Sequence, residues 1–129
     1  MKKLRSFLKF DAEAFFGKHK ELLVLEVKPH REFGGSDAVI GTKVTCVIIT
    51  DKSVIRTADG DISNLNVFEK LDIKIDQVGF DIPINSQIHL KPSEITCTVY
   101  GDYQNMISVK GSKNCFEIIQ NKQPNQGVQ

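Results

Sequence analysis

Residues 43–50 read KVTCVIIT, and this stretch decides the fold class because it is β-branched almost throughout and apolar on both faces toward its end. β-branched residues favour strands, and apolar residues on both faces are typical of a central strand. Residues 71–75, LDIKI, alternate apolar and charged side chains in the same way. The hydrophobic period is therefore two and not 3.6, which predicts a mostly β protein.

Further strands and turns follow from the same alternation and from Gly, Pro and Asp clusters. Pro29 is expected to weaken or end the first strand, because proline lacks a backbone N–H. The expected segments are strands over 23–28, 43–50, 70–75, 88–91, 95–100 and 106–110, a turn at 34–37, a hairpin turn at 101–104, and loops over 51–66 and 76–86.

Asp11 is expected to cap a short helix that extends to Phe16 and ends at Gly17, with Phe15 and Phe16 holding it on the body. Five or six short strands fit a five-stranded OB-like Greek-key barrel with this short N-terminal helix, and a small β-sandwich is the alternative. The expected domains are a basic flexible arm over 1–10, the OB-like β-barrel over 11–120, and a disordered tail over 121–129.

Composition indicates one cytoplasmic domain, since 129 residues is the size of a single domain. No apolar run approaches the roughly 20 residues that a membrane helix needs. Lys9 and Asp11 interrupt the apolar region that a signal peptide requires, so export is not expected. Cys46, Cys97 and Cys115 are odd in number and lack close spacing, which favours reduced, buried thiols.

The net charge of +1 argues against a uniformly basic nucleic-acid-binding protein. Residues 1–31 carry eight basic and four acidic residues, a net +4, while residues 32–129 carry nine basic and twelve acidic residues, a net −3. This asymmetry indicates a basic arm on a near-neutral body, and a solvated tail that only aids solubility is the alternative.

No catalytic or metal-binding motif is present, so neither an enzyme nor a cofactor is expected. His19, His30 and His89 lie far apart and match no metal-ligand spacing, and His89 is expected to be an exposed strand residue. Asp59-Gly60-Asp61 begins like a calcium loop, but the later ligands do not follow, so a turn is expected. A Cys–His pair assembled in space stays open, with buried cysteines preferred.

Basic and aromatic residues are interleaved, which is typical of proteins that bind single strands by holding phosphates and stacking bases. The alternative for the arm is that Phe7, Leu8 and Phe10 dock on the barrel while the lysines face water. Strict alternation places Phe68 with Lys70 and Lys74 on the solvent face, whereas a bulge near Glu69, the preferred interpretation, would return Phe68 to the core. The expected nucleic-acid-binding residues are Lys2, Lys3, Arg5, Phe7, Lys9, Phe10, Phe68, Lys70, Lys74, Tyr100, Tyr103 and Lys110.

Three stretches are informative when they are taken together, and these are KVTCVIITDKS at 43–53, NVFEKLDIKI at 66–75 and TVYGDYQNMISVKG at 98–111. Together they resemble small OB-fold single-stranded-DNA-binding proteins. The proteins in question are carried by conjugative plasmids, integrative elements and phages of Gram-positive bacteria. The resemblance implies single-stranded DNA as the ligand, a role in conjugative transfer or mobile-element DNA processing, and DNA-transfer or replication proteins as partners. The chain lacks tryptophan and an acidic C-terminal tail.

The alternative function is that of a protein-interaction module. Residues 32–104 carry six basic and eleven acidic residues, a net −5. An acidic surface of this kind is expected to dock a DNA-processing enzyme of a mobile element, such as a helicase or a relaxase.

Overall fold

The computed structural model of the chain describes residues 1–2, 9–17, 20–32, 38–52, 54–103 and 106–119. Most of this part of the chain is strand, as the period of two predicts. In chain order the elements are α1 (Ala12–Phe16), β1 (Lys20–Arg31), β2 (Val39–Asp51), β3 (Val54–Thr57), β4 (Gly60–Ser63), β5 (Lys70–Ile75), β6 (Gln87–Leu90), the 3-10 helix η2 (Pro92–Glu94), β7 (Ile95–Tyr100), β8 (Met106–Gly111) and β9 (Phe116–Ile118).

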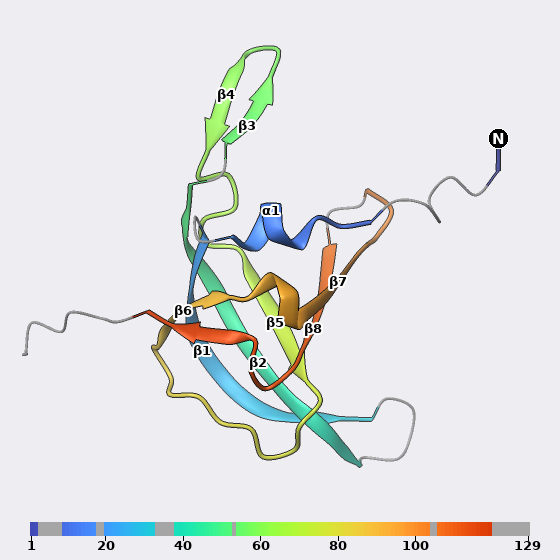
Figure 1. Ribbon diagram of the computed structural model, residues 1–129, viewed down its shortest axis with the longest axis vertical. Coiled ribbons are helices and arrows are strands. Elements are labelled where there is room, and N and C mark those ends of the chain that lie inside the picture. Colours follow the sequence, from blue (N-terminus) through green and yellow to red (C-terminus); the bar gives the residue numbers. More distant parts are fainter. Residues whose placement is uncertain (3–8, 18–19, 33–37, 53, 104–105, 120–129) are drawn as a thin grey trace, which may run out of the picture.

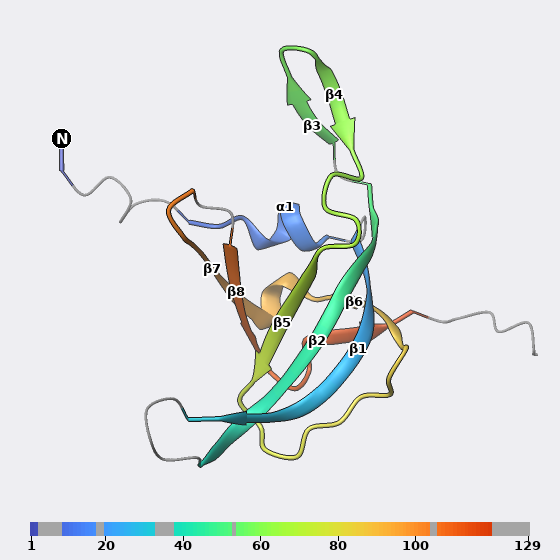
Figure 2. The same cartoon turned by 180° about the vertical axis from the view of Figure 1, so that it is seen from behind.

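In the described residues seven strands form one sheet, in the order β7-β8-β5-β2-β1-β6-β9, and β3 and β4 form a separate hairpin. Neighbouring strands of the large sheet are antiparallel, except that β5 and β8 run parallel. The sheet curls into a half-barrel, with α1 across its open side (Figure 1, Figure 2). This is the OB-like architecture that the sequence predicts, with more strands than the five expected, and it is not a sandwich of two facing sheets.

Irregularities in the register between β1 and β2 allow these long strands to bend. A bulge places two residues of one strand opposite one of the other and increases local bending. One such bulge at Leu25 also changes which side chains of β1 face inward. Leu22 and Val24 are buried before it, whereas Val27 packs on the core after it.

Pro29 does not end the first strand, contrary to the expectation, because β1 continues to Arg31. Pro29 lies opposite Thr42 of β2, while the other neighbour of β1, strand β6, pairs only with Leu22 and Leu23. Proline is tolerated in a strand where its missing N–H faces an unpaired edge. The free edge of β1 at this point is therefore what accommodates it.

The core lies inside the half-barrel and is built from the inward side chains of its strands. β2 lies between β1 and β5, so the prediction that residues 43–50 form a central strand is confirmed. Residues 76–86 contain no helix, also as expected. The buried apolar residues are Phe16, Leu22, Val24, Val44, Cys46, Ile48, Leu71, Ile73, Ile75, Ile82, Ile88, Leu90, Val109 and Cys115.

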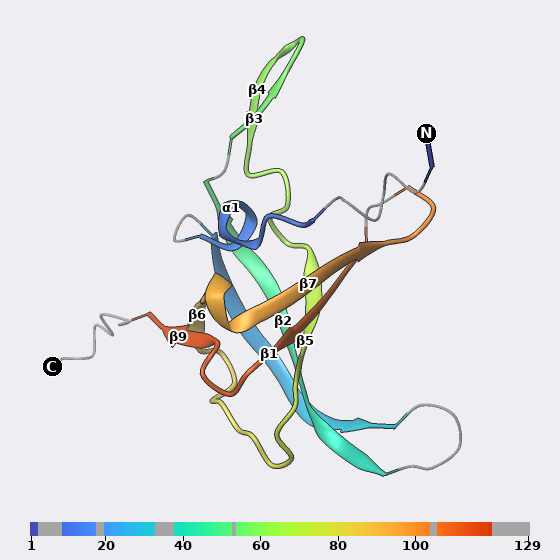
Figure 3. The same cartoon turned by 45° about the vertical axis from the view of Figure 1, so that its right-hand side comes forward.

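The N-terminal helix is short and is held in place by its phenylalanine side chains, as the sequence predicts. The Asp11 carboxylate accepts a hydrogen bond of 3.0 Å from the backbone N–H of Ala14, which caps α1. Phe16 is fully buried, and its ring lies 4.8 Å from that of Phe15 and 6.4 Å from that of Phe10. The view in Figure 3 places α1 above β7, at the open side of the curled sheet.

The prediction of a loop over 51–66 is wrong in its middle part, because β3 and β4 form a hairpin there. The hairpin stands away from the half-barrel (Figure 1), and every residue of both strands is exposed. The turn expected at Asp59-Gly60-Asp61 overlaps the turn of this hairpin at residues 58–59, which is followed by Gly60 at the start of β4 with a φ of +123°. The two strands pair only with each other and bury no side chain. They therefore lack the alternation of apolar and polar residues from which strands were predicted.

β7 and β8 form the expected antiparallel pair, and residues 101–103 of the expected hairpin turn lie in the bend that follows β7, while Gln104 lies outside the described residues. The expected turn at 34–37, the disordered tail over 121–129 and most of the arm lie outside the described residues. Neither helix in the described part of the chain is long and apolar enough to cross a membrane.

Candidate nucleic-acid interface

Lysines from four neighbouring strands lie side by side on the solvent face of the half-barrel. Lys28 of β1 lies opposite Lys43 of β2, Lys43 lies opposite Lys74 of β5, and Lys74 lies opposite Lys110 of β8. These four residues are called the lysine row here. Neighbouring strands are about 4.8 Å apart, so the lysine row crosses the sheet over about 14 Å.

Among the described residues, one member of the lysine row forms an ion pair and the other three do not. Lys28 Nζ lies 3.8 Å from a carboxylate oxygen of Glu26, but no ion pair between described residues includes Lys43, Lys74 or Lys110. Like charges directly opposite each other in a sheet are destabilising. An arrangement that lowers stability in this way is suited to a polyanion, whose charges would remove the repulsion.

Lys70 and Tyr100, two of the expected binding residues, lie beside the lysine row. Together with Lys74 and Met106 they line a shallow pocket of about 360 Å³. Tyr100 lies opposite Met106 in the hairpin of β7 and β8, and 48% of its surface is exposed. A half-exposed ring beside two lysines is the combination that holds a base and its phosphates.

Phe68 is exposed, so the preferred interpretation that it returns to the core is wrong. The expected bulge does exist, because the Phe68 N–H donates to the Ile48 carbonyl at 2.7 Å and the Ile48 N–H donates to the Glu69 carbonyl at 2.9 Å. Phe68 and Glu69 therefore both lie opposite Ile48, and Phe68 has a φ of +75°. The bulge turns the ring outward, and 80% of Phe68 is exposed.

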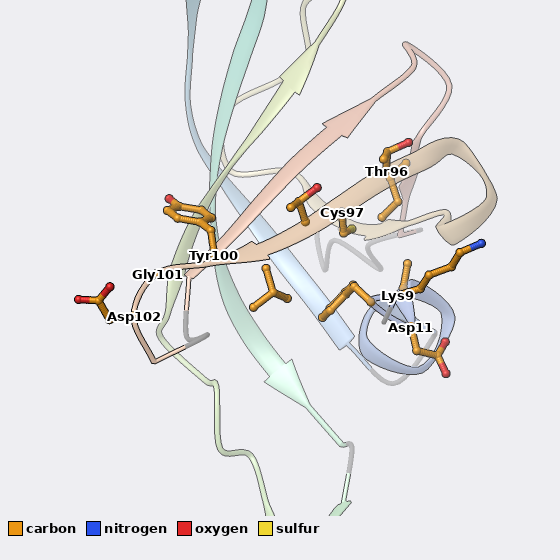
Figure 4. A pocket seen from close by; sticks show the side chains of 12 residues that line it. Lys9, Asp11, Thr96, Cys97, Tyr100, Gly101 and Asp102 are labelled. Carbon is orange, nitrogen blue, oxygen red and sulfur yellow. The ribbon is translucent and has the colours of Figure 1, made fainter. Parts of the chain in front are cut away.

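Lys9 and Phe10 do not lie on the face of the lysine row. They line an open groove of about 1040 Å³ between the N-terminal segment and β7. In Figure 4, Thr96 and Tyr100 point to one side of β7, while Lys9 lies on the other side. The Phe10 ring packs 5.3 Å from that of Phe15, so Phe10 follows the docked alternative and is no longer a candidate for base stacking.

The remaining expected residues are dispersed or cannot be placed. Tyr103 lies in the turn between β7 and β8 with 86% of its surface exposed. Lys2 is exposed. Lys3, Arg5 and Phe7 lie outside the described residues.

The described residues contain three thiols of raised pKa and no assembled group of metal ligands. Burial raises the pKa of Cys46 and Cys115 to about 12 and that of the half-buried Cys97 to about 11, so all three stay protonated thiols. No group of three His, Cys, Asp or Glu side chains in this part of the chain could hold a metal ion. His89 is half-buried and not exposed as expected, with Nδ1 3.0 Å from the carbonyl oxygen of Lys20.

Sequence reasoning missed Lys28, His30 and Lys43 at this face. His30 lies two residues beyond Lys28 on the same side of β1, and burial followed by the charges of Lys74, Lys43 and Lys110 lowers its pKa. The sequence indicates which positions of each strand are polar. It does not indicate the register between strands, which decides which of these positions lie opposite each other. Comparisons of the chain with protein-family models, curated proteins and solved structures give no match.

Proposed function

We propose that this protein binds single-stranded nucleic acid, with phosphates on the lysine row and bases on the rings beside it. The observation that carries the proposal is the alignment of Lys28, Lys43, Lys74 and Lys110 across four strands. Cations that track phosphates next to accessible aromatic rings are the common means of binding single strands. OB folds also bind oligonucleotides on the face of their second and third strands, which correspond here to β2 and β5.

The rings favour a single strand over a duplex. Phe68 lies two residues before Lys70, and Tyr100 shares a pocket with Lys70 and Lys74. Stacking on such rings requires unpaired bases and tolerates all sequences, because every base presents a flat face. Three parts of the proposal rest on the sequence. The sequence resemblance supports single-stranded DNA as the form bound and transfer or processing of mobile-element DNA as the pathway, while the composition supports the cytoplasm as the location.

Fluorescence anisotropy of a labelled oligo-dT strand tests the proposal. The affinity should fall as salt rises, with a log–log slope of about −0.7 for each phosphate contact, so that three or four contacts of the lysine row give about −2 to −3 and contacts of the arm add to this slope. Oligonucleotides of other sequence should bind within a few-fold. Absence of binding at low salt, with the protein shown to be folded, would contradict the proposal.

A protein-interaction module is the second candidate, and the β3–β4 hairpin favours it. Val54, Ile55 and Ile62 are 53%, 45% and 40% exposed. Ile55 and Ile62 lie opposite each other, so they share one face of the hairpin. Apolar side chains on a projecting element are typical of contact with another protein. Replacing both isoleucines with serine should leave oligo-dT binding unchanged and abolish binding to a partner enzyme if this candidate is correct.

A further inference from the structure

We propose that the pocket between His30, Lys74 and Lys110 holds one phosphate group of the bound strand, and that His30 takes up a proton as the phosphate binds. The inference rests on the proposed function, because the strand that supplies the phosphate is the proposed ligand of the lysine row. It adds a binding residue outside the expected set and a dependence of affinity on pH.

The pocket lies where the lysine row meets the end of β5, and its volume is about 410 Å³. His30 of β1 enters it opposite Gly41 of β2. A Cβ atom on Gly41 would collide with the carbonyl oxygen of Ile75, so the glycine permits the end of β5 to pack closely against β2. This close approach brings Lys74 to the imidazole of His30.

The charged groups around His30 come from several elements and are mostly basic. Lys43, Lys74 and Lys110 act on it from β2, β5 and β8. Asp76 and Glu94 also line the pocket and oppose them. Both acids are exposed, and the Glu94 carboxylate accepts a hydrogen bond of 2.6 Å from Ser112 Oγ. Lys28, Arg31 and Glu32 are the charged neighbours of His30 on its own strand and just beyond it.

The direction of the pH effect follows from these charges. In the free protein, burial and the three lysines lower the pKa of His30, so the ring is neutral at pH 7. A phosphate within the pocket attracts the proton and counteracts the lysines, which raises the pKa in the complex. Affinity must then increase as the pH falls through the pKa of the complex, and it becomes constant below the pKa of the free protein.

The test measures oligo-dT affinity from pH 8 to pH 5.5 at constant ionic strength, with an oligonucleotide that has hydroxyl groups at both ends. Phosphodiesters do not titrate in this range, so a change in affinity reports on the protein. We expect an increase of about tenfold, the factor that corresponds to a pKa change of one unit. The imidazole resonances of His30, assigned by comparison with His30→Gln, should give the higher pKa in the complex directly.

Two variants and a control make the result specific. His30→Gln should bind with nearly constant affinity at all pH values, at the weaker level of the unmodified protein at pH 8. His30→Lys should bind at the stronger level throughout, because its charge does not titrate. His89→Gln should keep the full pH response.

An unmodified protein whose affinity is constant with pH, or a His30→Gln variant that keeps the full response, would overturn this inference while leaving the proposed function intact. Absence of oligo-dT binding at every pH would overturn both. The two failures are therefore distinguishable.

Discussion

Lys20 Nζ and Asp51 Oδ1 lie 3.2 Å apart, and the structure shields both side chains from solvent. Lys20 begins β1 and Asp51 ends β2, and the same ammonium group lies 3.5 Å from the ring centroid of Phe15. The carbonyl of Asp51 accepts from the N–H of Asn64 at 3.0 Å, and its carboxylate accepts from the N–H of Asn66 at 3.3 Å. The pair thus joins the helix, the two long strands and the base of the β3–β4 hairpin.

Breaking this pair should unfold the protein at lower denaturant. Asp51→Asn leaves the buried Lys20 ammonium without a countercharge, and such a change costs about 3–5 kcal/mol of unfolding free energy. Urea denaturation measures the loss. The double variant Lys20→Met with Asp51→Leu should be more stable than Asp51→Asn, since no buried charge remains. A loss below about 1 kcal/mol in the single variant, typical of a surface pair, would contradict the account.

Substitutions at Phe68 separate the effect of its ring on binding from the effect of its backbone conformation on stability. Phe68→Ala removes an exposed ring, so stability should change by less than about 0.5 kcal/mol, while oligo-dT binding weakens by roughly 1–3 kcal/mol. Phe68→Gly should weaken binding equally but raise stability by about 1 kcal/mol, because glycine adopts a positive φ without the steric cost of a side chain. A stability loss of several kcal/mol in Phe68→Ala would mean that the ring belongs to the core.

The fold was largely predictable from the sequence because one face of each main strand is buried. Leu71, Ile73 and Ile75 alternate with charged residues, so their period identifies both a strand and its inward face. The β3–β4 hairpin was not predictable in this way, since its strands bury no side chain. Hydrophobic periodicity reports burial, and an element without burial produces no such pattern.

The candidate site was predictable only in part. Lys70, Lys74, Tyr100 and Lys110 were expected and do share one face. Lys43 could be assigned to this face only from the register between β2 and β5. That register depends on packing between strands and cannot be read from the sequence of either strand. The bulge at Phe68 was foreseeable from the sequence, but whether it turns the Phe68 ring toward the core or toward solvent was not. Both orientations of the ring leave the alternation of buried and exposed residues in β5 intact.

The three thiols should differ in reactivity according to their burial. Cys97 is half-buried beside the open groove, whereas Cys46 and Cys115 are fully buried. Maleimide at pH 7 should label Cys97 slowly, because only a small fraction is thiolate when burial raises its pKa to about 11. Cys46 and Cys115 should react only after unfolding. Mass spectrometry of the labelled peptides identifies each site, and rapid labelling of Cys46 in the folded protein would be inconsistent with this core.

The contribution of the arm can be measured by deleting residues 1–8. The deletion removes Lys2, Lys3 and Arg5 but keeps Phe10, whose ring packs against that of Phe15. Stability should therefore be retained, while oligo-dT affinity falls and the salt slope becomes shallower by up to about 2, at 0.7 for each lost contact. Unchanged affinity would show that the arm acts only as a solvated tail.

Phosphate binding by the lysine row is tested most directly by two double variants that remove the same charge. Lys74→Ala with Lys110→Ala takes two members from the lysine row, and Lys91→Ala with Lys113→Ala removes two exposed lysines that line neither pocket on this face. The first variant should stay folded, bind oligo-dT more weakly, and have a salt slope shallower by about 1.4, while the second should keep the affinity and slope of the unmodified protein. Equal affinities and equal slopes in the two variants would contradict the claim that the lysine row holds the phosphates.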